Sequence, residues 1–287
     1  MSTALKCNTV PATKPERTTL DVATIVLFLA MAIILSALWG YFASSHGMLN
    51  NARTAGLAAW LAQTTVFIAA AFTMLIRSPA ALRRVGWRLG SLKAYAAVLA
   101  VTFGVVALAL AIAYLMGGLL YAPQVTAMQA VATAPILFIP SCLFAFAEEF
   151  GWRGFLLPQL SPLGVRRALL VSGACWFLWE LPLVAFGLLD ASLIRLNLPV
   201  TLMLHFLQTV SVGVALGYLR LRFGSIWLPT FAHGSLNTLG AFAFFYFAEK
   251  QPFIGDFAGY VGTSLLVVLA ASLLVASRRL EGRTQST

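Results

Sequence analysis

The sequence predicts an all-α, polytopic membrane protein, because its composition is too apolar for a water-soluble globule and its apolar residues lie in long runs. Of the 287 residues, 60% are hydrophobic and only 10% are charged, whereas soluble domains carry about 25% charged residues. The runs match the roughly 20 residues that a helix needs to cross a bilayer. This composition excludes a cytosolic enzyme, a nucleic-acid-binding module and a disordered segment.

Eight segments are long and apolar enough to be predicted as membrane-spanning helices. They are Val22–Ala43, Leu57–Ile76, Ala94–Leu115, Thr133–Leu157, Ala168–Leu189, Pro199–Leu219, Ile226–Ala248 and Phe257–Ala276. The first is too long for the core of a signal peptide. The fourth contains Glu148, Glu149 and Arg153, but its apolar character continues to Leu157, so we expect one helix.

The positions of Lys and Arg predict the orientation of these helices. Fifteen of the 19 basic residues fall in one set of alternating connections. Only Arg53, Arg195 and Lys250 fall in the other set, and Arg153 lies within the fourth helix. Because basic residues accumulate in cytoplasmic loops, both termini are predicted to be cytoplasmic.

The expected organisation is a single transmembrane domain, residues 21–277, between cytoplasmic tails at 1–20 and 278–287. The net charge of +10 then reflects topology and attraction to anionic lipid, so we expect a lipid bilayer and no nucleic acid as partner. Cys7, Cys142 and Cys175 lack the spacing of metal ligands and are interpreted as ordinary apolar residues.

Several ionisable residues lie inside predicted spans, where each costs at least about 2.5–3.5 kcal/mol and normally faces a cavity or a partner. These residues are Glu148, Glu149, Glu180, His205 and His233. At about 1.5 Å per helical residue, Glu148, Glu180 and His233 lie at depths of roughly 14, 18 and 10 Å from the predicted cytoplasmic ends. Three helices thus place polar groups at similar depth, which predicts one cavity that opens to the cytoplasm.

Helical spacing indicates which of these groups share a face. Glu149 and Arg153 are four residues apart, as are His233 and Asn237. We expect Arg153 to hold Glu149 ionised as a clamp, which leaves Glu148 available for chemistry. The alternatives are an ion-paired clamp without chemistry for both glutamates, and a contact between helices for His233 and Asn237.

In this order along the chain, the residues resemble the three motifs of the CPBP intramembrane proteases, which include type II CAAX prenyl endopeptidases and bacterial immunity-type relatives. The motifs are Glu148-Glu149-x-x-x-Arg153, Trp176-x-x-x-Glu180 followed by Leu-Pro, and His233-x-x-x-Asn237, within a core at about residues 133–240. The resemblance implies that Glu148 activates a water and that His233 and Asn237 complete the site. It also implies a peptide or membrane-protein substrate.

One position departs from the family pattern, since the second motif of the family carries a histidine where this chain has Glu180. If the site binds a divalent metal such as zinc, Glu180 can serve as a ligand beside Glu148 and His233. If the histidine donated to a developing oxyanion, an ionised carboxylate would repel that charge, and Glu180 could donate only when protonated. A third alternative is that catalysis is lost, and a fourth that Glu180 is only a buried hydrogen-bonding group.

The leading hypothesis is therefore an intramembrane endopeptidase, a multi-pass protein of a bacterial or archaeal cell membrane, with Glu148, His233, Asn237 and Glu180 in the catalytic site. One alternative is a catalytically lapsed binding or immunity protein on the same fold. Another is an ion-coupled transporter, since intramembrane acids also mark such pathways, although no internal repeat is visible. His205 is interpreted as a polar contact outside the site.

Overall fold

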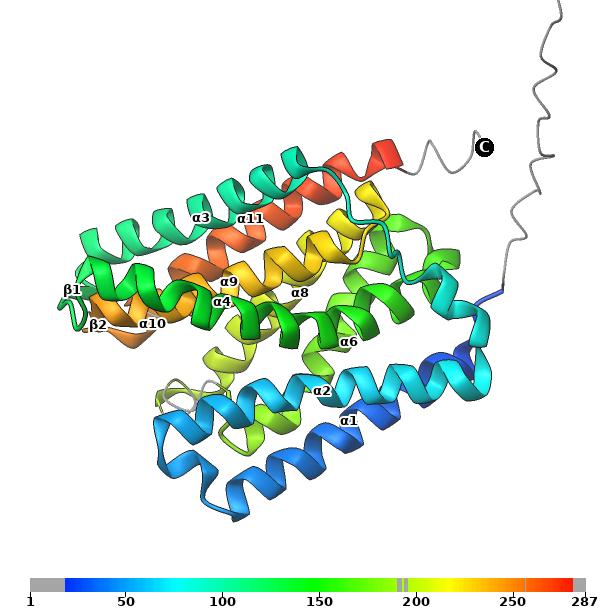
Figure 1. The fold of residues 1–287 in the computed structure, drawn as a ribbon, viewed down its shortest axis with the longest axis horizontal. Helices are drawn as coiled ribbons and strands as arrows, with labels where there is room; N and C mark the ends of the chain where they lie inside the picture. Colours follow the sequence, from blue (N-terminus) through cyan, green and yellow to red (C-terminus); the bar gives the residue numbers. More distant parts are fainter. Residues whose placement is uncertain (1–18, 190–192, 194–195, 256, 281–287) are drawn as a thin grey trace, which may run out of the picture.

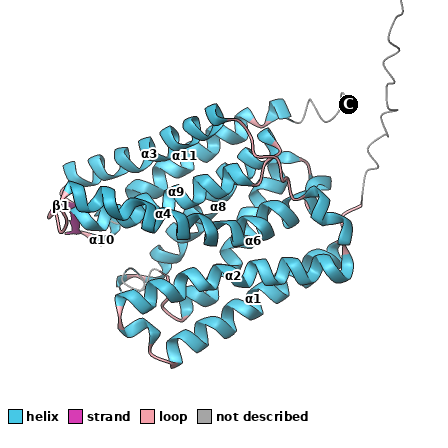
Figure 2. Ribbon diagram, in the orientation of Figure 1, coloured by secondary structure: helices cyan, strands magenta, loops and turns pink. Residues whose placement is uncertain are grey.

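The computed structural model describes residues 19–189, 193, 196–255 and 257–280. The two predicted tails lie largely outside these residues, as do Cys7 and Arg195. The described chain is a bundle of long helices with one small sheet at its edge (Figures 1 and 2). The predicted all-α membrane fold is confirmed.

The long helices correspond to the eight predicted segments, with ends shifted by a few residues. They are α1 (Val22–Ser45), α2 (Ala52–Arg77), α3 (Leu92–Leu115), α4 (Ala127–Glu149), α6 (Val165–Ala185), α8 (Leu198–Phe223), α9 (Trp227–Tyr246) and α11 (Tyr260–Ala276). The short helices are η1 (Met48–Asn50), η2 (Pro79–Arg84), α5 (Leu157–Gln159), η4 (Ser161–Leu163) and α10 (Pro252–Gly255). Strand β1 (Leu119–Tyr121) pairs antiparallel with β2 (Phe247–Glu249), with Leu120 opposite Ala248.

Seven helical segments among the described residues are long and apolar enough to cross a membrane, and α9 is not one of them. Polar residues, including His233, Ser235, Asn237 and Thr238, lower the hydropathy of α9. Helix α9 nevertheless runs along the bundle in contact with α3, α4 and α8 (Figure 1). Length and composition thus confirm seven of the eight predicted crossings. The argument for α9 as the eighth is its position inside the bundle, between other membrane-spanning helices.

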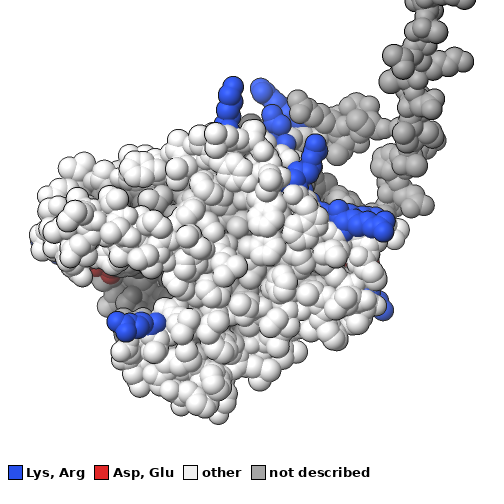
Figure 3. Space-filling view, viewed as in Figure 1, with Lys and Arg blue, Asp and Glu red and all other residues white. Residues whose placement is uncertain are grey.

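Both ends of the described chain lie at the same end of the bundle (Figure 1). Most of the Lys and Arg side chains visible on this face also gather there (Figure 3). The two observations agree with an even number of crossings and with the uneven distribution of charge in the sequence. That this basic end faces the cytoplasm stays a prediction.

Helix starts follow the local sequence. At the start of α1, the Thr24 hydroxyl and backbone N–H donate to the two Asp21 carboxylate oxygens at 2.7 and 3.0 Å. These two hydrogen bonds, the hydroxyl first, lower the pKa of the exposed Asp21 carboxyl. Thr126 and Gln129 form a capping box at the start of α4. Such caps satisfy backbone N–H groups that the first turn of a helix leaves unpaired.

The fourth predicted helix is not regular throughout. Between α4 and α5 the chain forms a π-helical segment, η3 (Phe150–Leu156), in which every residue is buried. A π-helical turn is a rare feature that recurs at functional sites. Gly151 permits it to pack against α2, because a Cβ there would collide with the Val66 side chain. The segment begins directly after Glu149 and carries Arg153.

Candidate active site

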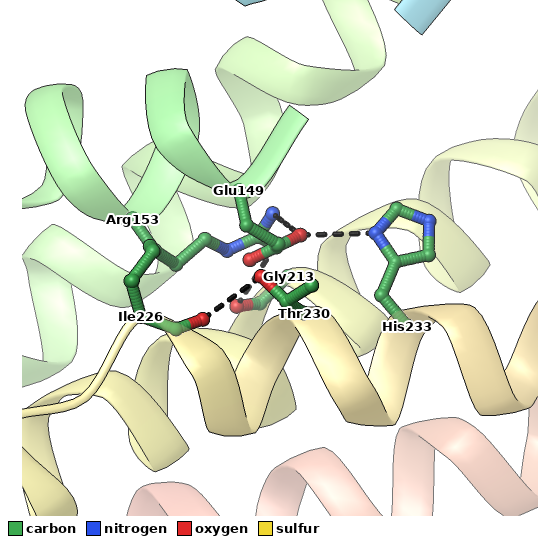
Figure 4. Close-up of polar contacts among 6 residues, drawn as sticks. All are labelled: Glu149, Arg153, Gly213, Ile226, Thr230 and His233. Carbon is green, nitrogen blue, oxygen red and sulfur yellow. Dashed lines mark hydrogen bonds and ion pairs between the residues drawn. The ribbon is translucent and has the colours of Figure 1, made fainter. Parts of the chain in front are cut away.

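Three charged or polar side chains form a continuous chain of contacts from η3 to α9 (Figure 4). Arg153 Nη1 donates to Glu149 Oε1 at 2.8 Å, and His233 Nδ1 lies 3.0 Å from the same oxygen. The side chains are buried, with Glu149 and Arg153 fully inaccessible. Because an ionised carboxylate only accepts hydrogen bonds, we assign the proton to His233 Nδ1. The predicted ion pair between Arg153 and Glu149 is formed, and Glu149 also orients the His233 imidazole.

Arg153 is held by two further contacts. Its Nη2 donates to the backbone carbonyl oxygen of Gly213 on α8 at 3.4 Å, and its guanidinium lies 4.5 Å from the centre of the Trp176 ring. The Trp176 ring lies 5.3 Å from the His233 ring, measured between centroids. Trp176, the aromatic residue of the second motif, thus touches both ends of the contact chain, a role that sequence reasoning missed.

Glu148 is the carboxylate of this region that lacks a hydrogen bond to any described group. Its side chain is buried, and its Oε2 is inaccessible and unpaired. Glu148 lies close enough to His233, Glu180 and Glu149 for direct charge–charge interactions. Since an unpaired buried carboxylate is costly, it is expected where function requires it.

Glu180 lies on α6 and contacts α8. Its Oε2 lies 3.1 Å from His205 Nε2 and accepts a hydrogen bond from Thr209 Oγ1 at 2.8 Å. His205 thus makes a polar contact, as predicted, and its partner is a predicted site residue. The reason is the close approach of α6 and α8, where a Cβ at Gly213 would lie 2.8 Å from Gly173 Cα.

Asn237 lies one helical turn beyond His233 on α9, on the same face. Its side chain is half-buried and makes no hydrogen bond with a described residue. The structure therefore brings Glu148, Glu149, Glu180 and His233 within interacting range. Asn237 lies one turn beyond His233 and has no hydrogen-bond partner among the described residues.

A comparison with known families finds one match to this part of the chain. Residues 130–239 match the model of the Rce1-like family, the type II CAAX prenyl endopeptidases. The match supports the resemblance of this segment to the CPBP intramembrane proteases. The segment runs from α4 into α9 and includes each predicted site residue, and we call it the CPBP core. No curated protein shows a significant match to the chain.

The predicted metal ligands of the CPBP core, Glu148, Glu180 and His233, do not form a metal site. In the part of the chain that the structure describes, no group of three or more His, Cys, Asp or Glu side chains is arranged to hold a metal ion. His233 Nδ1 contacts Glu149, and Glu180 Oε2 accepts a hydrogen bond from Thr209 and lies 3.1 Å from His205 Nε2 on α8. The donor set does not fit a preformed metal site, and we derive no step through a metal.

The predicted cytoplasm-facing cavity of the CPBP core also stays a prediction. An apolar cleft of about 270 Å³ lies between α3, α8, α9 and α11, but none of the predicted site residues lines it. Glu148 is 3% exposed and His233 is 5% exposed. Both side chains are therefore largely shielded from solvent in this structure.

Gly234 fixes the distance between α4 and α9 in the CPBP core. A Cβ at this position would lie 2.9 Å from both the backbone N and the Cα of Cys142. We expect Gly234→Ala to push α9 away from α4, because backbone atoms cannot turn aside, and to break the contact between His233 and Glu149. The expected loss is about 1–3 kcal/mol of unfolding free energy, measured by thermal unfolding in detergent.

Gly240→Ala is the matched control, since it lies on the same helix and a Cβ there meets nothing within 4 Å. It is expected to leave stability unchanged or to raise it by up to about 1 kcal/mol, because alanine favours a helix over glycine. Equal melting temperatures for the two variants would show that the close approach at Gly234 does not limit the packing.

Proposed function

We propose that this multi-pass membrane protein is an intramembrane endopeptidase in which Glu148 activates a water for attack on a peptide bond. The observation that carries this proposal is the contrast between the two adjacent glutamates. Glu149 is held through Oε1 by Arg153 and His233, although its Oε2 is unpaired, whereas Glu148 is buried, makes no hydrogen bond with a described residue and lies close to His233. A base must be able to take a proton, and Glu148 has no cation bound to it, whereas the direct ion pair with Arg153 holds Glu149 in its ionised form.

In the proposed reaction, Glu148 takes a proton from the water as its oxygen adds to the carbonyl carbon of the scissile bond. The carbonyl oxygen then carries the negative charge of a tetrahedral intermediate. Protonated Glu148 next gives its proton to the leaving amine as the carbon–nitrogen bond breaks. Each proton is thus returned, and the products are a carboxylic acid and an amine.

His233 and Asn237 are proposed to stabilise the oxyanion. A protonated His233 donates from Nδ1 to Glu149 and keeps Nε2–H for the oxyanion, so the negative Glu149 favours the charged imidazole that this requires. Arg153 anchors Glu149 in turn. The Asn237 amide, four residues beyond His233, presents a second donor on the same helix face.

The substrate is proposed to be a peptide segment that reaches the site from the basic end of the bundle, which we assign to the cytoplasm, or from the lipid. The matched family is described as type II CAAX prenyl endopeptidases. A test set therefore contains quenched fluorescent peptides that end in Cys-aliphatic-aliphatic-X, with and without an S-farnesyl group.

We expect His233→Ala to lower peptide cleavage by about 100-fold or more, since it removes both the oxyanion donor and the partner of Glu149. The measurement is cleavage of the peptide set by the purified protein in liposomes. His46→Ala is the matched control, because His46 is exposed between α1 and η1, and it is expected to cleave like the wild type.

The two alternative functions make different predictions. A lapsed binding or immunity protein would cleave none of the peptides, and its cellular effect would survive Glu148→Gln. A transporter would show ion flux in vesicles that depends on Glu180. Cleavage of a peptide by the wild type, lost in His233→Ala, would exclude the lapsed protein.

A further inference from the structure

We propose that Glu180 and His205 act as one unit that replaces the missing histidine of the second motif, with Glu180 touching the attacking water and His205 positioning Glu180. This inference rests on the proposed function and adds a residue from α8, outside the three motifs. It explains how the site can work although a histidine has been exchanged for a carboxylate.

Two side chains of α8 contact one oxygen of Glu180, His205 at ion-pair distance and Thr209 through a hydrogen bond. His205 Nε2 lies 3.1 Å from Glu180 Oε2, and Thr209 Oγ1 donates to the same atom at 2.8 Å. The Glu180 and His205 side chains are only 13% and 7% exposed. Glu180 Oε1 makes no hydrogen bond with a described residue. One oxygen is therefore fixed by α8, and the other is left for a further partner.

The free oxygen belongs to a carboxylate that lies near the proposed base. Glu180 interacts electrostatically with Glu148 and with Arg153, although Glu180 comes from α6 and Glu148 from α4. A water between the two glutamates would give one proton to Glu148 and donate its second O–H to Glu180 Oε1. Its lone pair would then be directed away from both carboxylates, toward the carbonyl carbon.

The charge of the Glu180–His205 pair explains why Glu180 alone would not replace the histidine of the second motif. An isolated ionised Glu180 would repel both Glu148 and the developing oxyanion. Paired with a protonated His205, it forms a unit with no net charge, like the neutral histidine of the family motif. The pair still offers a hydrogen-bond acceptor to the water, as an imidazole nitrogen does. His205 is therefore required only because position 180 is a glutamate.

This dependence gives the test its design. In the wild-type background, His205→Ala is expected to lower kcat by about 30-fold or more and to change KM by less than about threefold, because the water is misplaced while peptide binding is kept. In a Glu180→His background, where the family residue is restored, the same change at position 205 is expected to alter kcat by less than about threefold. A purely structural role of His205 would lower kcat in both backgrounds.

Thr209→Val is the milder variant and keeps the proposal testable if His205→Ala does not fold. It removes only the hydrogen bond from the Thr209 hydroxyl to Glu180 Oε2, and we expect a fall in kcat of about three- to tenfold at an unchanged melting temperature. Glu148→Gln is measured beside these variants with the same farnesylated and unmodified peptides.

The outcomes separate the two proposals. If Glu148→Gln abolishes cleavage while His205→Ala and Thr209→Val both keep wild-type kcat, the pairing proposal is overturned and the peptidase remains. An equal loss of kcat for His205→Ala in both backgrounds also overturns it. If Glu148→Gln retains wild-type cleavage, the proposed function itself fails.

Discussion

Glu148→Gln is expected to lower kcat for peptide cleavage by about 10²–10⁴-fold, because the amide keeps the shape of the side chain but cannot take a proton from water. The same substitution is expected to leave the protein at least as stable as the wild type. The native carboxylate is buried with an unpaired oxygen, and a neutral amide lowers the cost of desolvation. The measurement is kcat together with the melting temperature of the same preparation.

Glu149→Gln is the matched control, since it makes the same chemical change at the adjacent, equally buried position. Glu149 holds Arg153 and His233, so its loss is expected to lower the melting temperature as well as kcat. The opposite effects on stability distinguish a catalytic carboxylate from a clamp. A Glu148→Gln variant that retains kcat within about threefold of the wild type would contradict the assignment of Glu148 as base.

Arg153→Ala is expected to destabilise the protein by about 3–5 kcal/mol, because it leaves the fully buried Glu149 without its cation. The contacts of the guanidinium with the Gly213 carbonyl oxygen and the Trp176 ring are lost at the same time. Helices α6 and α8 thereby lose their contacts with Arg153. The measurement is equilibrium unfolding in micelles, monitored by tryptophan fluorescence.

A double-mutant cycle provides the control for Arg153. In the Glu149→Gln background, Arg153→Ala is expected to cost less than in the wild type, because no uncompensated carboxylate remains. A coupling of about 0.5–3 kcal/mol between the two sites is expected. If Arg153→Ala costs less than about 1 kcal/mol, the clamp does not hold these helices together.

Most of the fold follows from the sequence because the bilayer leaves few alternatives to the helix. The eight predicted segments correspond to the long helices, and the spacing of Glu149 and Arg153 predicts their ion pair. The crossing that composition does not confirm, α9, is the helix that carries His233 and Asn237. The polar residues of α9 face neighbouring helices and not lipid, so mean hydropathy alone does not identify α9 as a membrane-spanning helix.

The details of the site could not be predicted, because they depend on how helices approach one another. Nothing in the spacing indicates that His233 contacts Glu149, or that His205 contacts Glu180. The second contact depends on the close packing of α6 and α8 at Gly173 and Gly213. Small residues let two helices pack closely, but the sequence does not show which helix packs against which, so Gly173 and Gly213 alone do not predict this contact.

The π-helical segment was also beyond sequence reasoning. The apolar residues after Glu149 continue the pattern of a membrane helix, so one regular helix was expected. The two glycines Gly151 and Gly154 in η3 are the available signal, since they permit close contact with α2 and with Val85. The π-helical segment carries Arg153, which forms the ion pair with Glu149, so this irregular segment is part of the candidate site.

Cleavage in water enriched in ¹⁸O tests the central claim most directly, because it follows the oxygen that Glu148 is proposed to activate. Mass spectrometry of the products is expected to show one ¹⁸O in the new carboxyl terminus with the wild type, and at least about 100-fold less product with Glu148→Gln. A wild type that cleaves none of the peptides, a product without ¹⁸O, or labelled product formed equally by Glu148→Gln would contradict the account.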